Sequence, residues 1–499
     1  MTSFIGIDLG TTFSAVATID KTGRPVIISS SDDSTNITPS CVTEIEGVYV
    51  VGEEARRAWG SAPDQVAARF KREMGTSATQ SINSKEFSPT ELSALVLKKL
   101  TQHATSQLGE IGEAVVTIPA NFSNEARDAT MSAARSAGLN IKYIINEPTA
   151  AALYYAFKNG EELHGNYAVY DLGGGTFDVS IIRVNGQDIE VLASNGVSKL
   201  GGDDFDLALK TLVSKKYSEL TGEELEEGDF SLNDAEEEKK SLSKRKSVMV
   251  KVNRKMIEIT RAEFEEAIST QVTQAEMLCE STIEEADLSA ADIRAIFLAG
   301  GSTRIPLVQE SIERVFGMEP TASVNVDEVV ALGAALYAGY KGDKSNLSET
   351  QKNAIRSIKV SESTSKCFGT ISVVYDSLRN QEKLSNIVLI NKGDKIPCTV
   401  TQSFFTVHKG QEHVDCQLTE STASETDPRF VKIIWNGKLE LPADRPENQE
   451  IEVTYSYDEN QMMKCSFVDL ASKRKTEIDL SMSATESSTD NQIDKFMVE

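Results

Sequence analysis

From residue 1 to about 342, short apolar runs alternate with segments in which apolar residues recur at helical spacing. Val115–Ile118 and Ile293–Ala299 are runs of this kind, and each ends at a proline or glycine, as expected of buried strands. Ser88 is followed by a proline and, two residues later, a glutamate, which predicts a helix start, and Gly109 can end that helix. The alternation predicts an α/β domain over 1–342 with both sheet faces covered.

After residue 342 the pattern changes. Residues 343–359 are mostly polar and are interpreted as an interdomain linker. Residues 360–482 contain short alternating stretches such as VTQSFFTV and EIEVTYSY, separated by Gly, Pro, Asn and Asp, and these predict an all-β sandwich. Residues 483–499 are polar and acidic, which predicts a disordered tail.

Composition narrows the class of protein. The chain has 499 residues, 40% of them hydrophobic and 25% charged, and a formal net charge of −25. This acidity argues against nucleic acid and against an anionic membrane surface as partners. No apolar run is long enough to cross a membrane, and an expected strand beginning at Phe4 leaves no room for a secretory signal. The six cysteines are scattered without metal-binding spacing, so we expect free thiols and a cytoplasmic location.

One turn sequence occurs twice in the chain. Residues 4–20 read FIGIDLGTTFSAVATID, and residues 167–183 read YAVYDLGGGTFDVSIIR. Glycines let a backbone approach phosphate oxygens closely, threonine adds a hydroxyl donor, and an aspartate at a strand end can hold Mg²⁺. A single copy would be an ordinary tight turn, but two copies facing each other could grip a nucleoside triphosphate between two similar lobes.

Two further glycine turns strengthen this interpretation. FLAGGSTRIP at 297–306 follows an expected strand, and its Arg304 could stack on a base. KLGGDDFD at 199–206 supplies another glycine pair. The chain contains no G-x-x-x-x-G-K-[S/T] sequence, which excludes a Walker-type nucleotide site.

These motifs resemble those of the seventy-kilodalton heat-shock chaperones of the DnaK type, with the stretch 70–100 closer to a specialised bacterial branch. The resemblance spans about the first 340 residues and is weaker in the β-rich part. The motifs are GIDLGTT (6–12), FKREMG (70–75), VTIPANFS (116–123), INEPTAAAL (145–153), DLGGGTFDVS (171–180), LGGDDFD (200–206), LAGGSTRIP (298–306), VALGAALYAG (330–339) and, in the β-rich part, INKGDKIP (390–397). It implies a two-lobed α/β ATPase domain of the actin/hexokinase type followed by a β-sandwich peptide-binding domain.

The resemblance also implies roles for individual residues. ATP or ADP with Mg²⁺ is the implied cofactor, with Asp8 and Asp171 holding the metal through water. The implied catalytic residues are Lys71, Glu147, Thr176 and Asp178. The implied nucleotide-binding residues are Asp8, Gly10, Thr11, Thr12, Asp171, Gly173, Gly174, Gly175, Thr176, Gly201, Gly202, Asp203, Glu236, Lys239, Ser243, Gly300, Gly301, Ser302 and Arg304.

Each role has a plainer alternative. Lys71 lies in the charged stretch RFKRE and alone would be a surface lysine. Glu147 could simply begin a helix before a proline, and the charged run 236–255 could be a solvated helix face. The residues matching the family's peptide-gripping positions, Phe404, Val407 and Val414, could equally be ordinary sandwich core.

The resemblance assigns Pro119, Arg127 and Asp327 to coupling between the domains, with Asp327 helping to dock the linker. Three departures put coupling and peptide retention in doubt. The segment 354–360 alternates apolar and charged residues where the family has a leucine run, so we expect it to bury less and to couple weakly. Asn386 replaces an apolar residue of the arch over the peptide, and no long helical lid follows residue 480.

The leading interpretation is an ATP-dependent chaperone, shortened and without the lid, that binds extended hydrophobic peptide segments. Its implied partners are unfolded polypeptide, a J-domain co-chaperone and a nucleotide-exchange factor. An alternative is an ATP-switched adaptor whose β-domain binds one specific protein. A small-molecule kinase on the same fold is a third reading, but it would need a substrate aspartate as general base and no appended β-domain.

Overall fold

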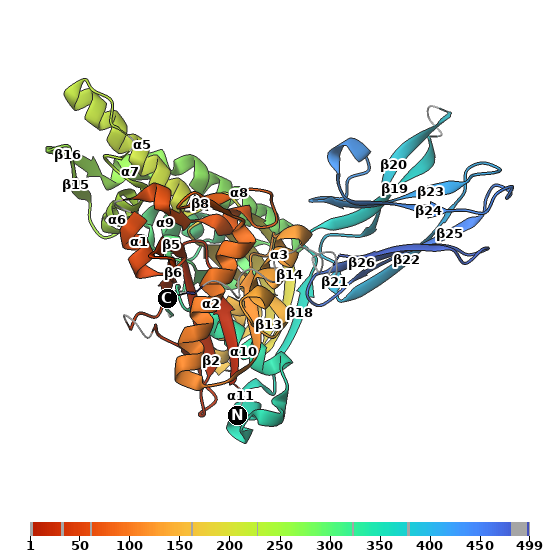
Figure 1. The fold of residues 1–499 in the computed structure, drawn as a ribbon, viewed down its shortest axis with the longest axis horizontal. Helices are drawn as coiled ribbons and strands as arrows, with labels where there is room; N and C mark the ends of the chain where they lie inside the picture. Colours follow the sequence, from red (N-terminus) through yellow and green to blue (C-terminus); the bar gives the residue numbers. More distant parts are fainter. Residues whose placement is uncertain are drawn as a thin grey trace. The chain divides into compact units, whose positions relative to one another are not determined.

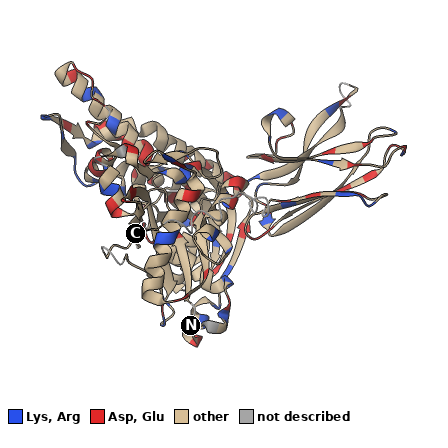
Figure 2. Cartoon of the chain, in the orientation of Figure 1, with Lys and Arg blue, Asp and Glu red and all other residues tan. Residues whose placement is uncertain are grey.

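The computed structural model describes residues 3–30, 34–59, 62–160, 163–226, 228–321, 324–376, 380–480 and 497–498 (Figure 1). The chain divides into two compact units. Unit 1 comprises Met1–Val360 together with Ser488–Glu499, and unit 2 comprises Ser361–Ser487. Acidic side chains are spread over the elements of both units, with Lys and Arg interspersed among them (Figure 2).

The first sheet of unit 1 carries the first copy of the repeated turn. Its strand order is β11-β10-β1-β2-β3, with β4 beside β2. β1 and β2 form an antiparallel hairpin, and β10 runs parallel to β1 on its other side. The strands are β1 (Ser3–Asp8), β2 (Phe13–Ile19), β3 (Pro25–Ile27), β4 (Thr38–Pro39), β10 (Ile111–Ile118) and β11 (Ile141–Asn146).

The second sheet repeats this plan. β12 (His164–Leu172) and β13 (Phe177–Asn185) form the hairpin that contains the second turn, and β17 (Ile293–Ala299) runs parallel to β12. β14 (Asp188–Val197) extends the sheet beyond β13. The strands predicted at Val115–Ile118 and Ile293–Ala299 are therefore confirmed as β10 and β17. β10 runs parallel to β1, and β17 runs parallel to β12, the two strands whose aspartates begin the repeated turns.

Helices fill the space around the two sheets. α10 packs against β1, β2 and α4, and the alanines and glycines of α10 allow this close approach. The helix predicted from Ser88 is confirmed: a capping box begins it and Gly109 ends it. The α-helices of unit 1 are α1 (Glu53–Trp59), α2 (Pro89–Leu108), α3 (Asn124–Ser136), α4 (Glu147–Asn159), α5 (Gly202–Thr221), α6 (Leu232–Leu242), α7 (Arg261–Ala267), α8 (Ser269–Glu285), α9 (Pro306–Phe316), α10 (Val329–Lys341) and α11 (Glu349–Ile355).

Smaller sheets complete unit 1. One has the strand order β6-β5-β7, so that β6 lies at its edge. The strands are β5 (Cys41–Ile45), β6 (Val48–Val51) and β7 (Val66–Ala68), followed by the hairpins β8 (Gln80–Ile82) with β9 (Lys85–Phe87) and β15 (Ser247–Val252) with β16 (Lys255–Thr260). Single 3₁₀ turns connect several elements, and one of them, η2 (Phe70–Glu73), directly follows β7.

The segment predicted to be a polar linker is structured and packs within unit 1. Ser348 and Gln351 form a capping box at the start of α11. Ile355 and Ile358 are each 1% exposed, and both belong to the core around α4 and α10. The expectation that this segment buries little is therefore wrong. The alternation of apolar and charged residues that appeared weak in the sequence places both isoleucines inward.

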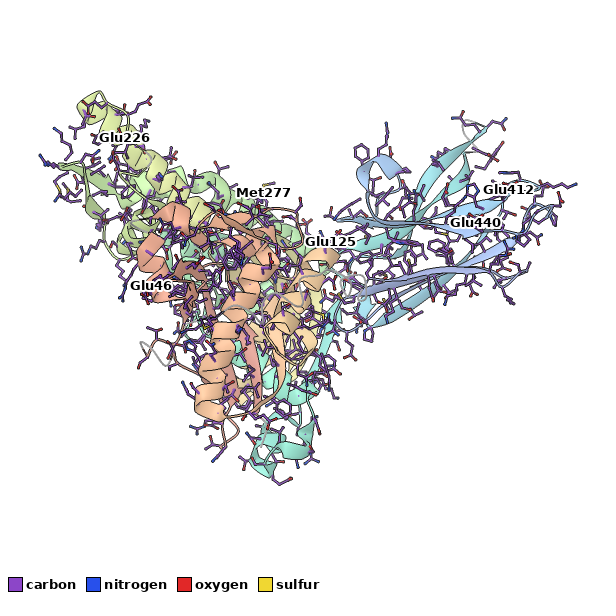
Figure 3. The ribbon with its side chains drawn as sticks, in the orientation of Figure 1. Glu46, Glu125, Glu226, Met277, Glu412 and Glu440 are labelled. Atoms are coloured by element: carbon purple, nitrogen blue, oxygen red, sulfur yellow. The ribbon has the colours of Figure 1, made fainter. Side chains whose placement is uncertain are left out.

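Unit 2 is a β-sandwich. Its two larger sheets have the orders β20-β19-β23-β24 and β22-β25-β26-β27, and side chains fill the space between them (Figure 3). The strands predicted from alternating stretches are present with small differences at their ends. From residue 359 onward the strands are β18 (Lys359–Ser363), β19 (Cys367–Asp376), β20 (Gln381–Ile390), β21 (Lys395–Ile396), β22 (Cys398–Phe405), β23 (His413–Ser421), β24 (Lys432–Glu440), β25 (Glu450–Tyr457), β26 (Met463–Asp469) and β27 (Lys475–Asp479).

Two predicted peptide-gripping residues belong to the sandwich core. Phe404 lies opposite Ile451, which is 2% exposed, and Val414 lies opposite Leu439, which is 1% exposed. Both side chains are partly buried against that core, so they contribute to it, and their role in peptide binding stays a prediction. Val407, in contrast, is 46% exposed and is still available to a ligand.

Asn386 is held in a network of hydrogen bonds, and its expected weakening of closure over a peptide stays a prediction. It is 1% exposed, and its Nδ2 donates to the Glu425 carbonyl at 2.7 Å. Its backbone N–H donates to the Thr426 carbonyl at 2.8 Å, and its Oδ1 accepts from the Thr419 hydroxyl at 2.6 Å. An apolar residue could make only the backbone bond, so the polar side chain fastens this loop to β20.

Most of the predicted disordered tail lies outside the described residues. Met497 and Val498 are described, and they pair with β6 of unit 1, so the prediction of disorder is wrong for these two residues. In the described part of the chain, no helix is long and apolar enough to cross a membrane.

Candidate functional site

A cavity of about 600 Å³ opens in unit 1 at the ends of the two hairpins. Both copies of the repeated turn line it, which explains why the chain contains the pattern twice. The predicted residues on its wall are Asp8, Gly10, Thr11, Thr12, Lys71, Glu147, Asp171, Gly173, Gly174, Thr176, Asp203, Glu236, Lys239, Ser243, Gly300, Gly301, Ser302 and Arg304. Gly175, Asp178, Gly201 and Gly202 lie behind this wall, where they support the lining residues.

The two turns touch each other across the cavity. A Cβ built on Gly174 would lie 1.9 Å from the Thr12 hydroxyl, and one built on Gly175 would lie 2.6 Å from the Thr11 methyl group. Only glycine fits at these two positions, because any larger residue would push the lobes apart. The Thr12 hydroxyl is buried and has no hydrogen-bond partner among the described residues, so it is available to a ligand oxygen.

Carboxylates gather at the closed end of the cavity. Asp8 ends β1, Asp171 lies near the end of β12, and Asp178 lies opposite Asp171 on β13. Desolvation and the charge of Glu147 raise the pKa of Asp8 to about 7 and that of Asp178 to about 8. The same causes, with Asp178 and Asp8 contributing, raise the pKa of Asp171 well above its usual range. A bound cation would relieve this concentration of negative charge.

Lys71 is buried beside these carboxylates. It lies in η2, is 3% exposed, and its Nζ is 2.5 Å from Glu147 Oε1. Glu147 is the first residue of α4, and the centroid of the Phe122 ring lies 5.8 Å from the Lys71 ammonium. The reading of Lys71 as a surface lysine is therefore wrong. Its ammonium is held at the cavity wall by a carboxylate on one side and an aromatic ring on the other.

The third and fourth glycine turns close over the second copy of the repeat. Gly202 N–H donates to the Gly173 carbonyl at 3.0 Å, and Asp203 N–H donates to the Gly174 carbonyl at 2.7 Å. The Ser302 hydroxyl also donates to the Gly173 carbonyl at 2.9 Å. These bonds fix the backbone of the second turn. The glycine pair at 201–202 therefore supports that turn without lining the cavity itself.

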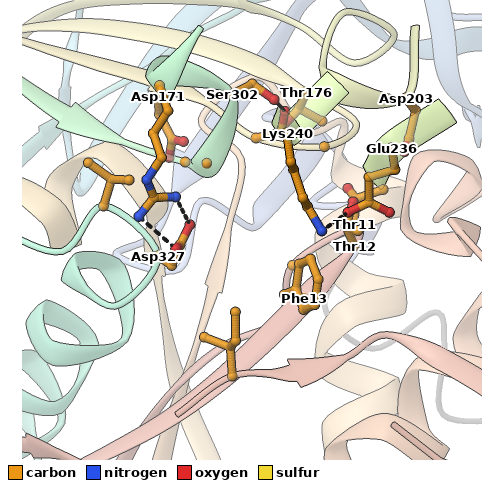
Figure 4. A pocket seen from close by; sticks show the side chains of 18 of the residues that line it. Thr11, Thr12, Phe13, Asp171, Thr176, Asp203, Glu236, Lys240, Ser302 and Asp327 are labelled. Carbon is orange, nitrogen blue, oxygen red and sulfur yellow. Dashed lines mark hydrogen bonds and ion pairs between the residues drawn. The ribbon is translucent and has the colours of Figure 1, made fainter. Parts of the chain in front are cut away.

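Charged side chains line the far end of the cavity. Glu236 on α6 pairs with Lys240 at 2.9 Å and with Arg56 of α1 at 3.2 Å. Lys240 and Arg56 also lie near the ring of Phe13, at 5.5 and 5.0 Å from its centroid. Figure 4 shows Lys240 extending between Glu236 and Phe13. Lys239 pairs with Asp206 at 2.8 Å and donates to the Gly202 carbonyl at 2.8 Å.

Sequence reasoning missed several residues at this end. Phe13 follows the first motif directly, and Lys240 is four residues from Glu236, so both had a local signal. Arg56 had none, because only the tertiary fold brings α1 to α6. The charged run beginning at Glu236 is not simply a solvated face, since Glu236 is 4% exposed and Lys239 is 8% exposed.

Asp327, predicted to help dock the linker, forms an ion pair with Arg304. Its Oδ2 lies 2.8 Å from Arg304 Nη2 and its Oδ1 accepts from Nη1 at 3.0 Å, so the pair is bidentate. Both residues line the cavity (Figure 4). Asp327 therefore lies where it can orient Arg304, and its role in docking the linker stays a prediction. Stacking of Arg304 on a base stays a prediction.

Pro119 and Arg127 lie at the two ends of the short segment that contains Phe122, whose ring is near Lys71. Arg127 is 1% exposed, and it donates to the carbonyls of Ala120 and Phe122 at 3.0 and 3.1 Å. It thus holds the loop that follows Pro119 and that places the Phe122 ring beside Lys71. The loop joins these two predicted coupling residues to the catalytic end of the cavity.

The comparison with known protein families is decisive. The family described as "Hsp70 protein" matches residues 4–86 and 76–499, which together span nearly the whole chain. The chain belongs to the Hsp70 family. Its α/β unit accordingly has the two-lobed actin/hexokinase-like ATPase fold, and unit 2 is the β-sandwich that follows it. Hsp70 proteins are ATP-dependent chaperones that bind polypeptides and co-chaperones, and they use ATP or ADP, typically with Mg²⁺.

The cavity of this Hsp70 suits such a ligand. The unpartnered Thr12 hydroxyl and the Lys71 ammonium match phosphate oxygens, and the crowded carboxylates of Asp8 and Asp171 match a divalent cation. Among the described residues, no group of three or more His, Cys, Asp or Glu side chains is arranged to hold a metal by itself. A magnesium ion here would therefore need water and phosphate oxygens as further ligands, which is its usual preference.

Proposed function

We propose that this Hsp70 hydrolyses Mg²⁺-ATP in the unit 1 cavity and uses the nucleotide state to control binding of extended hydrophobic polypeptide by unit 2. The observation that carries the proposal is the convergence of Lys71, Glu147, Asp8 and Asp171 on two facing glycine turns, with the buried Asp178 opposite Asp171 on the neighbouring strand. Family membership supports it in general terms, and the residue roles are our own assignment.

The residues at the carboxylate end of the cavity would have two roles, holding the nucleotide with its cation and stabilising charge during phosphoryl transfer. Bound Mg²⁺-ATP would supply the γ-phosphoryl group and a divalent charge between Asp8 and Asp171. Lys71, fixed by Glu147, would place its ammonium against the charge that develops on the transferred group. Burial and the charge of Glu147 raise the pKa of Asp178 to about 8, and a nearby cation would lower it. Thr11, Thr12 and Thr176 would orient phosphate oxygens through their hydroxyls.

The polypeptide surface that we propose lies on the outer face of β19 and β20. Val373 and Leu384 are direct cross-strand partners, and Tyr375 is on the same face two residues further along β19. Their exposed fractions are 37%, 62% and 64%. Asn386, which fastens the loop at 425–426, pairs with Ile371 on this same face. Exposed apolar side chains beside a fastened loop are suited to hold an extended apolar segment.

The J-domain co-chaperone, the exchange factor and the cytoplasmic location remain parts of this proposal. The two partners rest on family membership, and the location rests on the cysteine pattern and the expected lack of a secretory signal. The adaptor alternative shares the same ATPase and differs only in the ligand of unit 2. It would become the better reading if the β19–β20 face bound no extended peptide.

Single-turnover ATP hydrolysis by the full chain tests the catalytic assignment. Lys71→Ala should keep nucleotide affinity within about tenfold, roughly 1.4 kcal/mol, because the glycine turns and threonines remain. It should lose most of the turnover, because the positioned charge is gone. Lys142→Ala is the matched control, since Lys142 is an exposed lysine of unit 1 that pairs with Glu113 outside the cavity. Undiminished hydrolysis by Lys71→Ala would overturn the assignment.

A further inference from the structure

Strand β6 is the edge of its three-stranded sheet, and the residues that cover this edge come from the far end of the chain. Tyr49 N–H donates to the Met497 carbonyl at 2.9 Å, and Tyr49 forms a parallel bridge with Val498. On α2, Gln102 Nε2 donates to the Val498 carbonyl at 3.2 Å. Two backbone groups of the segment are therefore bonded to two different elements of unit 1.

The two residues alternate as a strand does. Val498 is 7% exposed and belongs to the same buried cluster as Tyr49, whereas Met497 is 69% exposed. An extended segment that adds to a sheet edge gains affinity from backbone hydrogen bonds and selectivity from every second side chain. Val498 is the selective position here, and Met497 contributes through its carbonyl alone.

The receiving surface is firmly held. The Tyr49 ring packs edge-on against Phe87 with 5.5 Å between centroids, and Lys85 Nζ donates to the Tyr49 hydroxyl at 3.2 Å. Lys85 also lies over the Phe87 ring at 4.9 Å. Gln102 itself is exposed on α2, so its side-chain amide can reach a segment arriving from solvent. A rigid edge with one added amide is arranged to accept an extended chain.

We propose that the β6 edge is a second peptide-docking surface, which the chain fills with its own Met497–Val498 segment, and that this docking is reversible. The site lies in unit 1, apart from the β19–β20 face, and does not depend on ATP hydrolysis. Its self-occupation protects an edge strand that would otherwise offer unpaired backbone groups to other chains. Because the segment is tethered, even weak intrinsic binding keeps the edge occupied at a high effective concentration.

Hydrogen exchange at the Tyr49 amide tests the docking in the full chain. Val498→Asp should speed exchange at Tyr49 by at least about tenfold, because a buried apolar contact is replaced by a charge. Gln102→Ala changes the receiving side at an exposed residue and should speed the same amide by a smaller factor. Met497→Ser is the matched control and should leave the rate unchanged, since only its carbonyl takes part. Equal exchange rates of the Tyr49 amide in Val498→Asp, Gln102→Ala and Met497→Ser would overturn the proposed docking.

Peptide competition tests the exchange. A fluorescein-labelled peptide with the sequence QIDKFMVE, residues 492–499, should bind saturably to a chain lacking 497–499. It should bind the full chain at least about tenfold more weakly, because the tethered segment competes. The peptide with aspartate in place of its valine should bind neither chain. Equal binding of the first peptide to both chains, or no binding to the deletion chain, would overturn the proposal.

Discussion

The candidate sites of the two units differ in character, since buried charge gathers at one and exposed apolar side chains at the other. Unit 1 buries charge around a cavity: Lys71, Asp171 and Asp178 are 3%, 7% and 1% exposed. Unit 2 exposes apolar surface instead, with Tyr375 at 64% and Leu384 at 62% on one sheet face. Burial of a charge is costly unless a partner or a ligand compensates it, and exposure of large apolar groups is unfavourable unless something covers them.

The difference indicates what each unit lacks in isolation. In unit 1 the mutual repulsion of carboxylates would be relieved by a cation with a polyanion, since their pKa values are raised by desolvation and by one another. In unit 2 the exposed stripe would be relieved by an apolar segment. Unit 2 does bury one charged pair, Arg445 with Asp469 at 2.7 and 2.9 Å, but there the two charges satisfy each other.

The largest effect is expected at the carboxylates of unit 1. Asp171→Asn should lower Mg²⁺-dependent ATP turnover by at least about 100-fold, roughly 2.7 kcal/mol, because one anionic ligand of the hydrated cation is lost. Steady-state turnover over a Mg²⁺ titration measures this. Asp292→Asn changes an exposed aspartate at a 3₁₀ turn and serves as the control. If the turnover of Asp171→Asn stays within about threefold of the wild type, the assignment of the metal to this end of the cavity would be wrong.

The second effect concerns the exposed face of unit 2. Leu384→Asp should weaken binding of an apolar heptapeptide to the full chain by about tenfold, since burying such a side chain is worth about 1.5–3 kcal/mol. Fluorescence anisotropy gives the affinity. Phe405→Ser, at a 56% exposed position on β22 of the other sheet, is the matched control and should have little effect. If the control loses affinity and Leu384→Asp does not, the peptide face has been placed on the wrong sheet.

A smaller effect follows from pH. Burial and Glu147 raise the pKa of Asp178 from its ordinary value of 3.8 to about 8, so the folded chain keeps a proton that the unfolded chain releases near pH 3.8. Ionising Asp178 therefore lowers the free energy of unfolding progressively between about pH 4 and pH 8. Without nucleotide, Asp178→Asn should melt at the wild-type temperature below about pH 4 and about 2–4 °C or more above it at about pH 8.

Asp292 has a pKa shift of the opposite sign to that of Asp178. Hydrogen bonds from the side chain and backbone of Ser289 lower the pKa of Asp292, so its contribution to stability is present above the unfolded pKa and is lost on acidification. Asp292→Asn should therefore show no gain in melting temperature at about pH 8. A gain of equal size in both variants would mean that the Asp178 effect is not electrostatic.

The smallest effect is local to the loop of unit 2. Asn386→Ala removes the bonds to Glu425 and Thr419 and leaves their buried partners unsatisfied, a cost of about 1–3 kcal/mol. Exchange of the amides in 422–431 should quicken while those of β25 stay unchanged. Unaltered exchange in the loop would show that Asn386 does not fasten it and would favour the sequence-based expectation of a weakened arch.

Local sequence patterns predicted much of the wall of the unit 1 cavity. Glycine turns, strand ends and the capping box at Ser88 depend on neighbouring residues, so they are visible in the chain. Pairings made only by the tertiary fold were not predicted: Asp327 with Arg304, Arg56 with Glu236, and the segment at Met497–Val498 with β6. Phe404 and Val414 were assigned to peptide binding by the resemblance, and their partial burial against the sandwich core appears only in the structure.

The burial of the segment 354–360 was underestimated, because the number of its apolar residues was taken as a measure of how much apolar surface it buries. Ile355 and Ile358 are each 1% exposed, and each such side chain is worth about 1.5–3 kcal/mol when buried. A few kcal/mol decides a two-state equilibrium. We therefore replace the expectation of weak coupling with one of substantial coupling between nucleotide state and polypeptide affinity.

Peptide affinity of the full-length Lys71→Ala chain, measured by fluorescence anisotropy with saturating Mg²⁺-ATP and then with Mg²⁺-ADP, tests this account most directly. The variant holds each nucleotide state long enough for equilibrium, because its hydrolysis is slow. We predict an affinity at least about tenfold lower with ATP than with ADP, a coupling of roughly 1.4 kcal/mol or more. Equal affinities in the two states would contradict the account, since the cavity of unit 1 would then not control unit 2.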